Sequence, residues 1–186
     1  MTCIVGLVDD NKIYMGADSA GVDGYSLTVR KDEKVFINGD FIMGFTSSFR
    51  MGQRFRYSFT PPTHNKEIEI YRYMVSEFAE SIRKLFKDHG YATIENSSES
   101  GGTFLVGYSG RLFQIGDDFQ VGESILNFDS VGCGFGFAKG SLYSTEGQLP
   151  TNRIRKALEA AVEFSAGVRP PFHILSGADK YKETKS

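Results

Sequence analysis

The chain opens with Thr2-Cys-Ile-Val-Gly-Leu-Val8, then Asp9-Asp-Asn-Lys12, then Ile13-Tyr-Met-Gly-Ala17. Two apolar runs separated by a short polar run predict a β-hairpin whose strands are both buried. Chain ends usually fray. A chain that enters a core strand at its second residue therefore predicts that this residue is held in a fixed place.

Beyond this hairpin, the sequence alternates paired strands with helices. Further strands are expected at 29–36 and 40–45, which turn at Asn38-Gly39, at 103–108 and 111–115, which 119–121 extends, and at 172–175. Helices are expected up to Arg56, over Lys66–His89, over 137–144 and from 150 to 164, with a polar loop at 95–102. This order predicts an α+β fold with antiparallel sheets inside and helices outside. A four-layer αββα sandwich fits it, although the pattern alone does not select that architecture.

Composition indicates one globular domain. The 186 residues include 40% hydrophobic and 24% charged residues, with a net charge of −2. We expect a single domain over 1–186, with a core at 2–176 and a loose polar tail at 177–186. The charge favours neither a nucleic-acid nor a membrane partner. With no secretory signal and only two cysteines, which do not form a disulfide scaffold, the cytoplasm is the expected location.

Three residues with distinctive chemistry lie at equal separations along the chain. Thr2 becomes the first residue once Met1 is removed, Asp18 ends the second strand, and Lys34 lies in a charged run. The α-amino group of an N-terminal threonine has an ordinary pKa near 7.7 to 8.0 and can act as the base for its own hydroxyl. A neighbouring lysine lowers the pKa values of the amine and hydroxyl, and an aspartate holds the lysine. Together the three predict acyl transfer without a cofactor.

Each of these residues also has an ordinary interpretation. A threonine at the second position permits removal of Met1, an aspartate followed by Ser19 often caps a turn, and a lysine in a charged run usually faces solvent. Only their combination, in register with the expected strands, favours a catalytic site over these readings.

The motifs resemble those of proteasome β subunits and of the bacterial HslV peptidase. Thr2-x-x-Val-Gly6, Gly16-Ala-Asp-Ser19 and Lys34-Val35 are similar to the family's N-terminal part, without a gap between the three positions. Met43-Gly-Phe-Thr-Ser-Ser48 resembles the family's oxyanion segment Ala-Gly-Phe-Ala-Gly-Gly. Val131-Gly-Cys-Gly134 resembles Ile-Gly-Ser-Gly, and residues 156–176 are similar to the last helix and strand of HslV. The resemblance covers nearly the whole chain.

The resemblance implies a threonine-type peptidase with the αββα fold of the N-terminal nucleophile hydrolases. Thr2 would form the acyl-enzyme, assisted by Asp18 and Lys34, and the amide of Ser47 would stabilise the oxyanion. Cys133 stands where the family has the serine that bonds the terminal amine, and a thiol is a weaker donor and acceptor. Ser47-Ser48 replaces a flexible glycine pair, which constrains the backbone.

The resemblance also implies a substrate strand, a cation site and an assembly. The substrate strand and first pocket would lie near Gly21, Val22, Asp32, Phe36 and Phe45. Aromatic residues there favour apolar side chains, whereas Asp32 favours a basic one, and the sequence does not decide between them. Backbone carbonyls near Val162, Ser165 and Val168 would hold a structural cation. Homo-oligomeric rings, either two stacked hexamers or another closed symmetry, would receive unfolded polypeptides from an ATP-dependent unfoldase.

The alternative is an inactive ring subunit or scaffold with the same fold. The changes at Cys133 and at Ser47-Ser48 favour it because both alter groups that touch the nucleophile. The retained Asp18 and Lys34 argue against it, because a buried charged pair is costly to keep without use.

Overall fold

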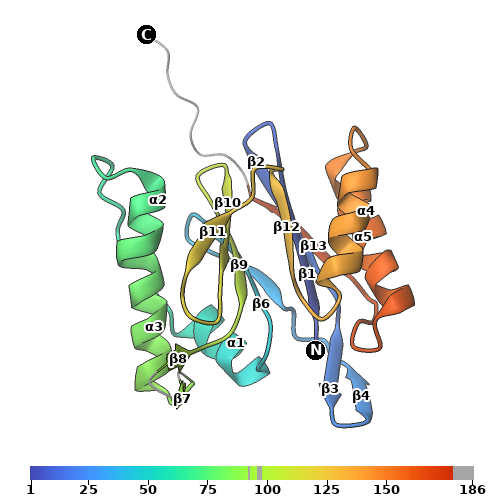
Figure 1. The fold of residues 1–186 in the computed structure, drawn as a ribbon, viewed down its shortest axis with the longest axis horizontal. Coiled ribbons are helices and arrows are strands. Elements are labelled where there is room, and N and C mark those ends of the chain that lie inside the picture. The colour runs from blue at the N-terminus through green and yellow to red at the C-terminus, as the bar shows by residue number, and fades with distance from the viewer. Residues whose placement is uncertain (92, 96–97, 178–186) are drawn as a thin grey trace.

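Two antiparallel sheets stack face to face between two helical layers in the computed structural model, which describes residues 1–91, 93–95 and 98–177 (Figure 1). The first sheet has the order β12-β1-β2-β13, formed by Phe128–Gly132, Cys3–Asp9, Lys12–Ala17 and His173–Gly177. The second has the order β11-β10-β9-β6-β5, formed by Val121–Glu123, Arg111–Ile115, Phe104–Tyr108, Phe41–Phe45 and Val35–Asn38. This confirms the expected α+β class and the αββα layering.

Helices cover the outer face of each sheet. Helices α4 (Phe135–Ser144) and α5 (Pro150–Phe164) cover the first sheet, and α1 (Phe49–Tyr57) lies with the long helix against the second. The long helix comprises α2 (Ile70–Tyr73), a π-helical segment η1 (Met74–Phe78) and α3 (Ala79–Asp88).

The period of two along β1 explains the layering. Cys3, Val5 and Leu7 pack against α4 and α5, whereas Ile4 faces the second sheet. Alternate side chains of a strand point to opposite faces, so a strand buried on both sides reads as continuously apolar. The N-terminal hairpin is therefore buried on both faces, as its sequence predicted.

The second expected strand pair differs from the structure. Residues 29–36 were expected to form one strand, but Val29 ends β4 (Ser26–Val29), which pairs with β3 (Ala20–Asp23) in a separate two-stranded hairpin. Strand β5 starts only at Val35, and the β5–β6 turn lies at Gly39-Asp40, one residue later than expected. Leu27 and Val29 of the β3–β4 hairpin are exposed, so no alternation of buried and exposed residues marked it in the sequence.

The remaining differences concern boundaries and three strands that were not expected. The long helix begins at Ile70 rather than at Lys66, because residues 66–69 form a turn before the Glu69 side chain caps the helix. At the start of the polar loop expected over 95–102, Thr93–Glu95 (β7) pairs with Ser98–Ser100 (β8). Strand β12 was not expected, because Asp129 and Ser130 interrupt its apolar character. Of the expected loose tail, Gly177 belongs to β13, and 178–186 lie outside the described residues.

Candidate active site

The carboxylate of Asp18 is the centre of a buried polar cluster at the end of β2. Its Oδ1 accepts hydrogen bonds from Lys34 Nζ at 2.8 Å, from the Cys3 amide at 3.0 Å and from the Thr2 hydroxyl at 3.3 Å. Its Oδ2 accepts from the amides of Ala20 at 2.8 Å and Arg169 at 3.1 Å. Five donors thus fix a carboxylate that is completely buried. The structure therefore brings Thr2, Asp18 and Lys34 together.

Lys34 reaches this cluster from the segment between β4 and β5. Its side chain is 1% exposed, and it forms an ion pair with the fully buried Asp18. Burial lowers the pKa of the Lys34 ammonium, and the charge and hydrogen bond of Asp18 oppose that effect. The Phe49 ring, whose centroid lies 5.7 Å from Lys34 Nζ, partly covers it. A lysine in this environment is a local source of positive potential beside the Thr2 hydroxyl.

The backbone nitrogen of Thr2 faces a second group of polar atoms. In this chain it is an amide, because Met1 is attached, and it stands where a terminal amine would lie after processing. It donates to Cys133 Sγ at 3.3 Å, and the same thiol donates to the Thr2 carbonyl at 3.3 Å. The Ser165 hydroxyl donates to Cys133 Sγ, also at 3.3 Å. A freed Thr2 amine would therefore have a thiol and, through it, a hydroxyl as its polar neighbours.

Gly132 makes this approach possible. It ends β12 with φ +94°, and a Cβ on it would lie 2.3 Å from the Thr2 carbonyl oxygen. Backbone cannot move out of the way as a flexible side chain can, so only glycine lets β12 end against Thr2. Cys133 is held beside the Thr2 nitrogen for this reason.

Ser47 follows β6 and carries a strained backbone. Its φ is +70°, a left-handed conformation that favours glycine, and its hydroxyl lies 3.3 Å from the Thr46 hydroxyl. The serine thus holds a conformation that glycine adopts more readily. The role of its amide in an oxyanion hole stays a prediction.

The residues expected to bind substrate divide into two groups. Gly21 and Val22 lie half-buried on β3, and Asp32 lies nearby with a side chain that is 40% exposed. Phe36 and Phe45 are only 2% and 5% exposed and belong to the core beneath α1. The structure does not bring these two rings to a surface where substrate can lie. They point to the outer face of a sheet that is buried on both faces.

Asp32 is already paired. Arg30 donates to both of its carboxylate oxygens, at 2.7 and 2.8 Å, which lowers the pKa of Asp32. The Arg30 guanidinium also lies 3.9 Å from the centroid of the Phe49 ring. The pairing of Arg30 with Asp32 was not expected from the sequence, since nothing in the local pattern indicates that the arginine side chain folds back onto Asp32.

Several solved structures are similar to this chain in fold. Thiobacillus denitrificans BPH in complex with epoxomicin aligns with a TM-score of 0.77 and 20% identity, over 94% of this chain and 97% of that one. HslV from Trypanosoma brucei aligns at 0.66 and 15%, over 94% and 98%. Anbu, an ancestral beta-subunit from Yersinia bercovieri, aligns at 0.65 and 12%, over 94% and 81%. Neither a protein-family model nor a curated protein matches the chain by sequence.

The chain has the proteasome/HslV-like N-terminal nucleophile hydrolase fold. The alignment spans 94% of the chain in each case. The recognition made from the N-terminal motifs is therefore confirmed at the level of the fold.

In the loop after α5, the chain's own arginine occupies two of the carbonyl oxygens that were expected to hold a cation. Val162 lies in α5, while the carbonyls of Ser165 and Val168 accept hydrogen bonds from Arg169 Nη1 at 3.4 and 2.6 Å. A bound cation would need the same two oxygens, so the residues present do not fit one as they stand. No group of three or more His, Cys, Asp or Glu side chains in the described part of the chain is placed to hold a metal.

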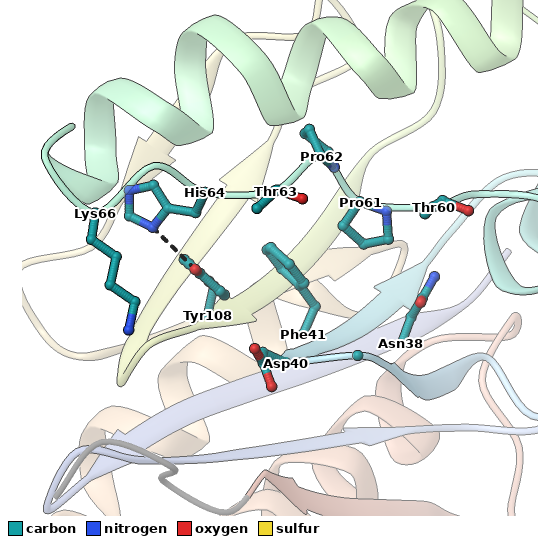
Figure 2. A pocket seen from close by; sticks show the side chains of 11 residues that line it. Asn38, Asp40, Phe41, Thr60, Pro61, Pro62, Thr63, His64, Lys66 and Tyr108 are labelled. Atoms are coloured by element: carbon teal, nitrogen blue, oxygen red, sulfur yellow. Dashed lines mark hydrogen bonds between the residues drawn. The ribbon is translucent and has the colours of Figure 1, made fainter.

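A groove of about 470 Å³ lies at the other end of β6, outside the HslV-like site (Figure 2). Its wall includes Phe41, Pro61, Pro62 and Tyr108, and the His64 ring lies against Tyr108. The His64 Nε2 donates to the Ile68 carbonyl at 2.9 Å, so its Nδ1 accepts from the Tyr108 hydroxyl at 3.0 Å. Phe41 and Phe45 are the ends of β6, roughly 13 Å apart in an extended strand. None of the expected site residues lines this groove.

Proposed function

We propose that the chain is a threonine-type endopeptidase that degrades unfolded polypeptides through an acyl-enzyme on Thr2 after removal of Met1. The observation that carries the proposal is the convergence of the Thr2 hydroxyl and the Lys34 ammonium on one oxygen of Asp18. Thr2 is 3% exposed, so its hydroxyl is held in place by the protein rather than by solvent. A fixed hydroxyl beside a buried lysine is an arrangement that can support nucleophilic acyl transfer.

In the proposed mechanism, the Thr2 amine takes the proton from Thr2 Oγ1, and this oxygen attacks the peptide carbonyl carbon. The protonated amine then gives its proton to the leaving amine as the peptide bond breaks, which leaves an ester on Thr2. A water molecule, deprotonated by the same amine, attacks the ester, and the amine gives this proton back to Thr2 Oγ1 as the acid is released. Lys34 lowers the pKa of the amine, Asp18 holds Lys34, and the Ser47 amide stabilises the oxyanion.

We further propose that substrate lies extended along β3. In the described part of the chain β3 pairs only with β4, so its other edge is available for an added strand. Gly21 has no side chain that would cover the backbone of β3 at this point. Because Arg30 already neutralises Asp32, we propose a preference for apolar over basic side chains.

Assembly into homo-oligomeric rings, fed by an ATP-dependent unfoldase in the cytoplasm, completes the proposal. Large apolar side chains remain exposed on α4 and α5, among them Phe135, Phe137, Tyr143 and Phe164. The rings of Phe137 and Phe164 lie 5.3 Å apart and form one apolar surface. Such a surface favours contact with another copy of the chain. Among the described residues, none of the helices has the length and apolar character that crossing a bilayer requires.

The proposal is tested by comparing Thr2→Ala, Thr2→Ser and Thr151→Ala in hydrolysis of unfolded casein and of fluorogenic peptides. Thr151 is an exposed threonine on α5 and serves as the matched control. We expect Thr2→Ala to abolish hydrolysis with unchanged unfolding, Thr2→Ser to retain part of it, and the control to match the wild type. Wild-type rates in the Thr2→Ala variant would refute the proposal.

An inactive subunit with the same fold is the second candidate. Met1 packs beside the site, where a Cβ on Gly167 would lie 2.4 Å from Met1 Cβ and 2.9 Å from Cys133 Sγ. If Met1 were retained, the Thr2 nitrogen would stay an amide and the base would be lost. Hydrolysis by the wild type that depends on the Thr2 hydroxyl would exclude this candidate.

A further inference from the structure

The loop that follows α5 holds Asp18 directly through its backbone. The Arg169 amide donates to Asp18 Oδ2 at 3.1 Å, and the Arg169 carbonyl accepts from the Ser19 amide at 2.8 Å. The Ser19 hydroxyl donates to the Pro171 carbonyl at 2.6 Å. The position of the carboxylate at the centre of the site therefore depends on the conformation of this loop.

The Arg169 side chain folds back into its own loop. Its Nη1 donates to the Val168 carbonyl at 2.6 Å and to the Ser165 carbonyl at 3.4 Å. The amide of Val168 donates to the Ser165 carbonyl at 3.3 Å, and the Val168 side chain is fully buried. Backbone carbonyl oxygens are also ligands of bound metal ions, and here the positive charge that they accept from belongs to the chain itself.

Among the described residues, Arg169 takes part in no ion pair with a carboxylate. Its charge is therefore directed to the backbone carbonyls of its own loop. A metal ion bound to the same oxygens would lie close to the guanidinium, and two like charges at that separation repel each other.

We propose that the guanidinium of Arg169 is a built-in cation that takes the place of a bound metal ion and fixes the loop that positions Asp18. Arg169 is thus a positioning residue, and the chain does not need a metal ion at this loop. The inference on the cation is independent of the proposed peptidase function, since it concerns only the conformation of the loop.

The test compares thermal unfolding of the full chain in choline chloride with a chelator against unfolding in Na⁺, K⁺, Mg²⁺ or Ca²⁺. For the wild type we expect Tm values that agree within about 1 °C among these salts. Arg155→Met, which removes an exposed arginine of α5, is the control that corrects for the general effect of ionic strength. For Arg169→Met we expect Tm to fall by about 5 °C in choline. Either a metal ion or methylguanidinium, at concentrations far below denaturing, should restore it.

A wild-type Tm that rises by several degrees with one cation would overturn the proposal, even if Arg169→Met does not fold. An Arg169→Met variant that loses no stability would overturn it as well. Arg169→Lys keeps the positive charge on a shorter side chain, so its Tm should lie between those of the wild type and Arg169→Met.

A second readout tests the positioning of Asp18 and rests on the proposed function. The rate at which epoxomicin modifies Thr2 should fall at least tenfold in Arg169→Met and recover with methylguanidinium. If the wild type shows no modification, the proposed function fails. The Tm comparison then still tests whether Arg169 takes the place of a metal ion. If Arg169→Met is modified at the wild-type rate, Arg169 does not position Asp18.

Discussion

Replacing Lys34 by methionine removes one partner of the buried ion pair and leaves the other charged. Lys34 Nζ lies 2.8 Å from Asp18 Oδ1, and the two side chains are 1% and 0% exposed. Removing one member of a buried pair typically costs about 3–5 kcal/mol, because an uncompensated charge stays in the interior. Asp18 keeps four other donors, three of them backbone amides. We therefore expect a loss near the lower end, about 3 kcal/mol.

Urea unfolding of the wild type, Lys34→Met and Lys84→Met measures this loss. Lys84 is the matched control, since it also pairs with an aspartate at 2.8 Å but its side chain is 76% exposed. Exposed pairs contribute little, so Lys84→Met should leave the free energy of unfolding close to that of the wild type. A loss below about 1 kcal/mol in Lys34→Met, or equal losses in both variants, would refute the reasoning, because an unpaired buried charge destabilises the folded state by more than that.

The stability difference between the wild type and Lys34→Met should also depend on pH. Burial lowers the pKa of Lys34 in the folded chain below its ordinary value of 10.5. Between these two pKa values the unfolded chain binds the proton and the folded chain does not, so stability rises with pH in that window. The wild type should therefore gain stability relative to Lys34→Met as pH rises towards 10.5. A difference that stays flat or declines over this alkaline range would contradict the direction of the pKa change.

Three further substitutions probe the backbone and the substrate pocket. Ser47→Gly should stabilise the fold by about 0.5 kcal/mol in urea unfolding, since it relieves the positive φ, whereas Ser47→Ala should not; equal effects would contradict the strain. Gly132→Ala should cost more than about 3 kcal/mol, because its Cβ meets backbone, whereas Gly136→Ala in α4, where a Cβ has open space, should be neutral or stabilising. Arg30→Met frees the Asp32 carboxylate and should raise the cleavage of peptides with basic relative to apolar side chains severalfold; an unchanged ratio in a peptide panel would show that Asp32 does not face substrate.

The sequence revealed the centre of the molecule because its signals there are local. The N-terminal hairpin is apolar on both faces with polar turn residues, so its strands and their burial followed directly from the pattern. Thr2, Asp18 and Lys34 lie at spacings that match a known family, and the structure brings them together. Their geometry could be anticipated because two of them flank one hairpin.

Other parts could not be predicted, for physical reasons that differ from place to place. Asp129 and Ser130 interrupt the pattern of β12, yet both are buried in the structure. Phe36 and Phe45 belong to a sheet that is buried on both faces, so hydropathy cannot tell which face each side chain takes. The contacts of Arg169 with carbonyl groups depend on the loop conformation, which leaves no trace in residue types.

The most direct test of the account is the intact mass of the purified chain before and after incubation with epoxomicin. We expect a mass lower than that of the full sequence by one methionine residue. One inhibitor molecule should then add to each chain, and none should add to Thr2→Ala. A chain that retains Met1 and gains no inhibitor would contradict the claim that Thr2 is the nucleophile.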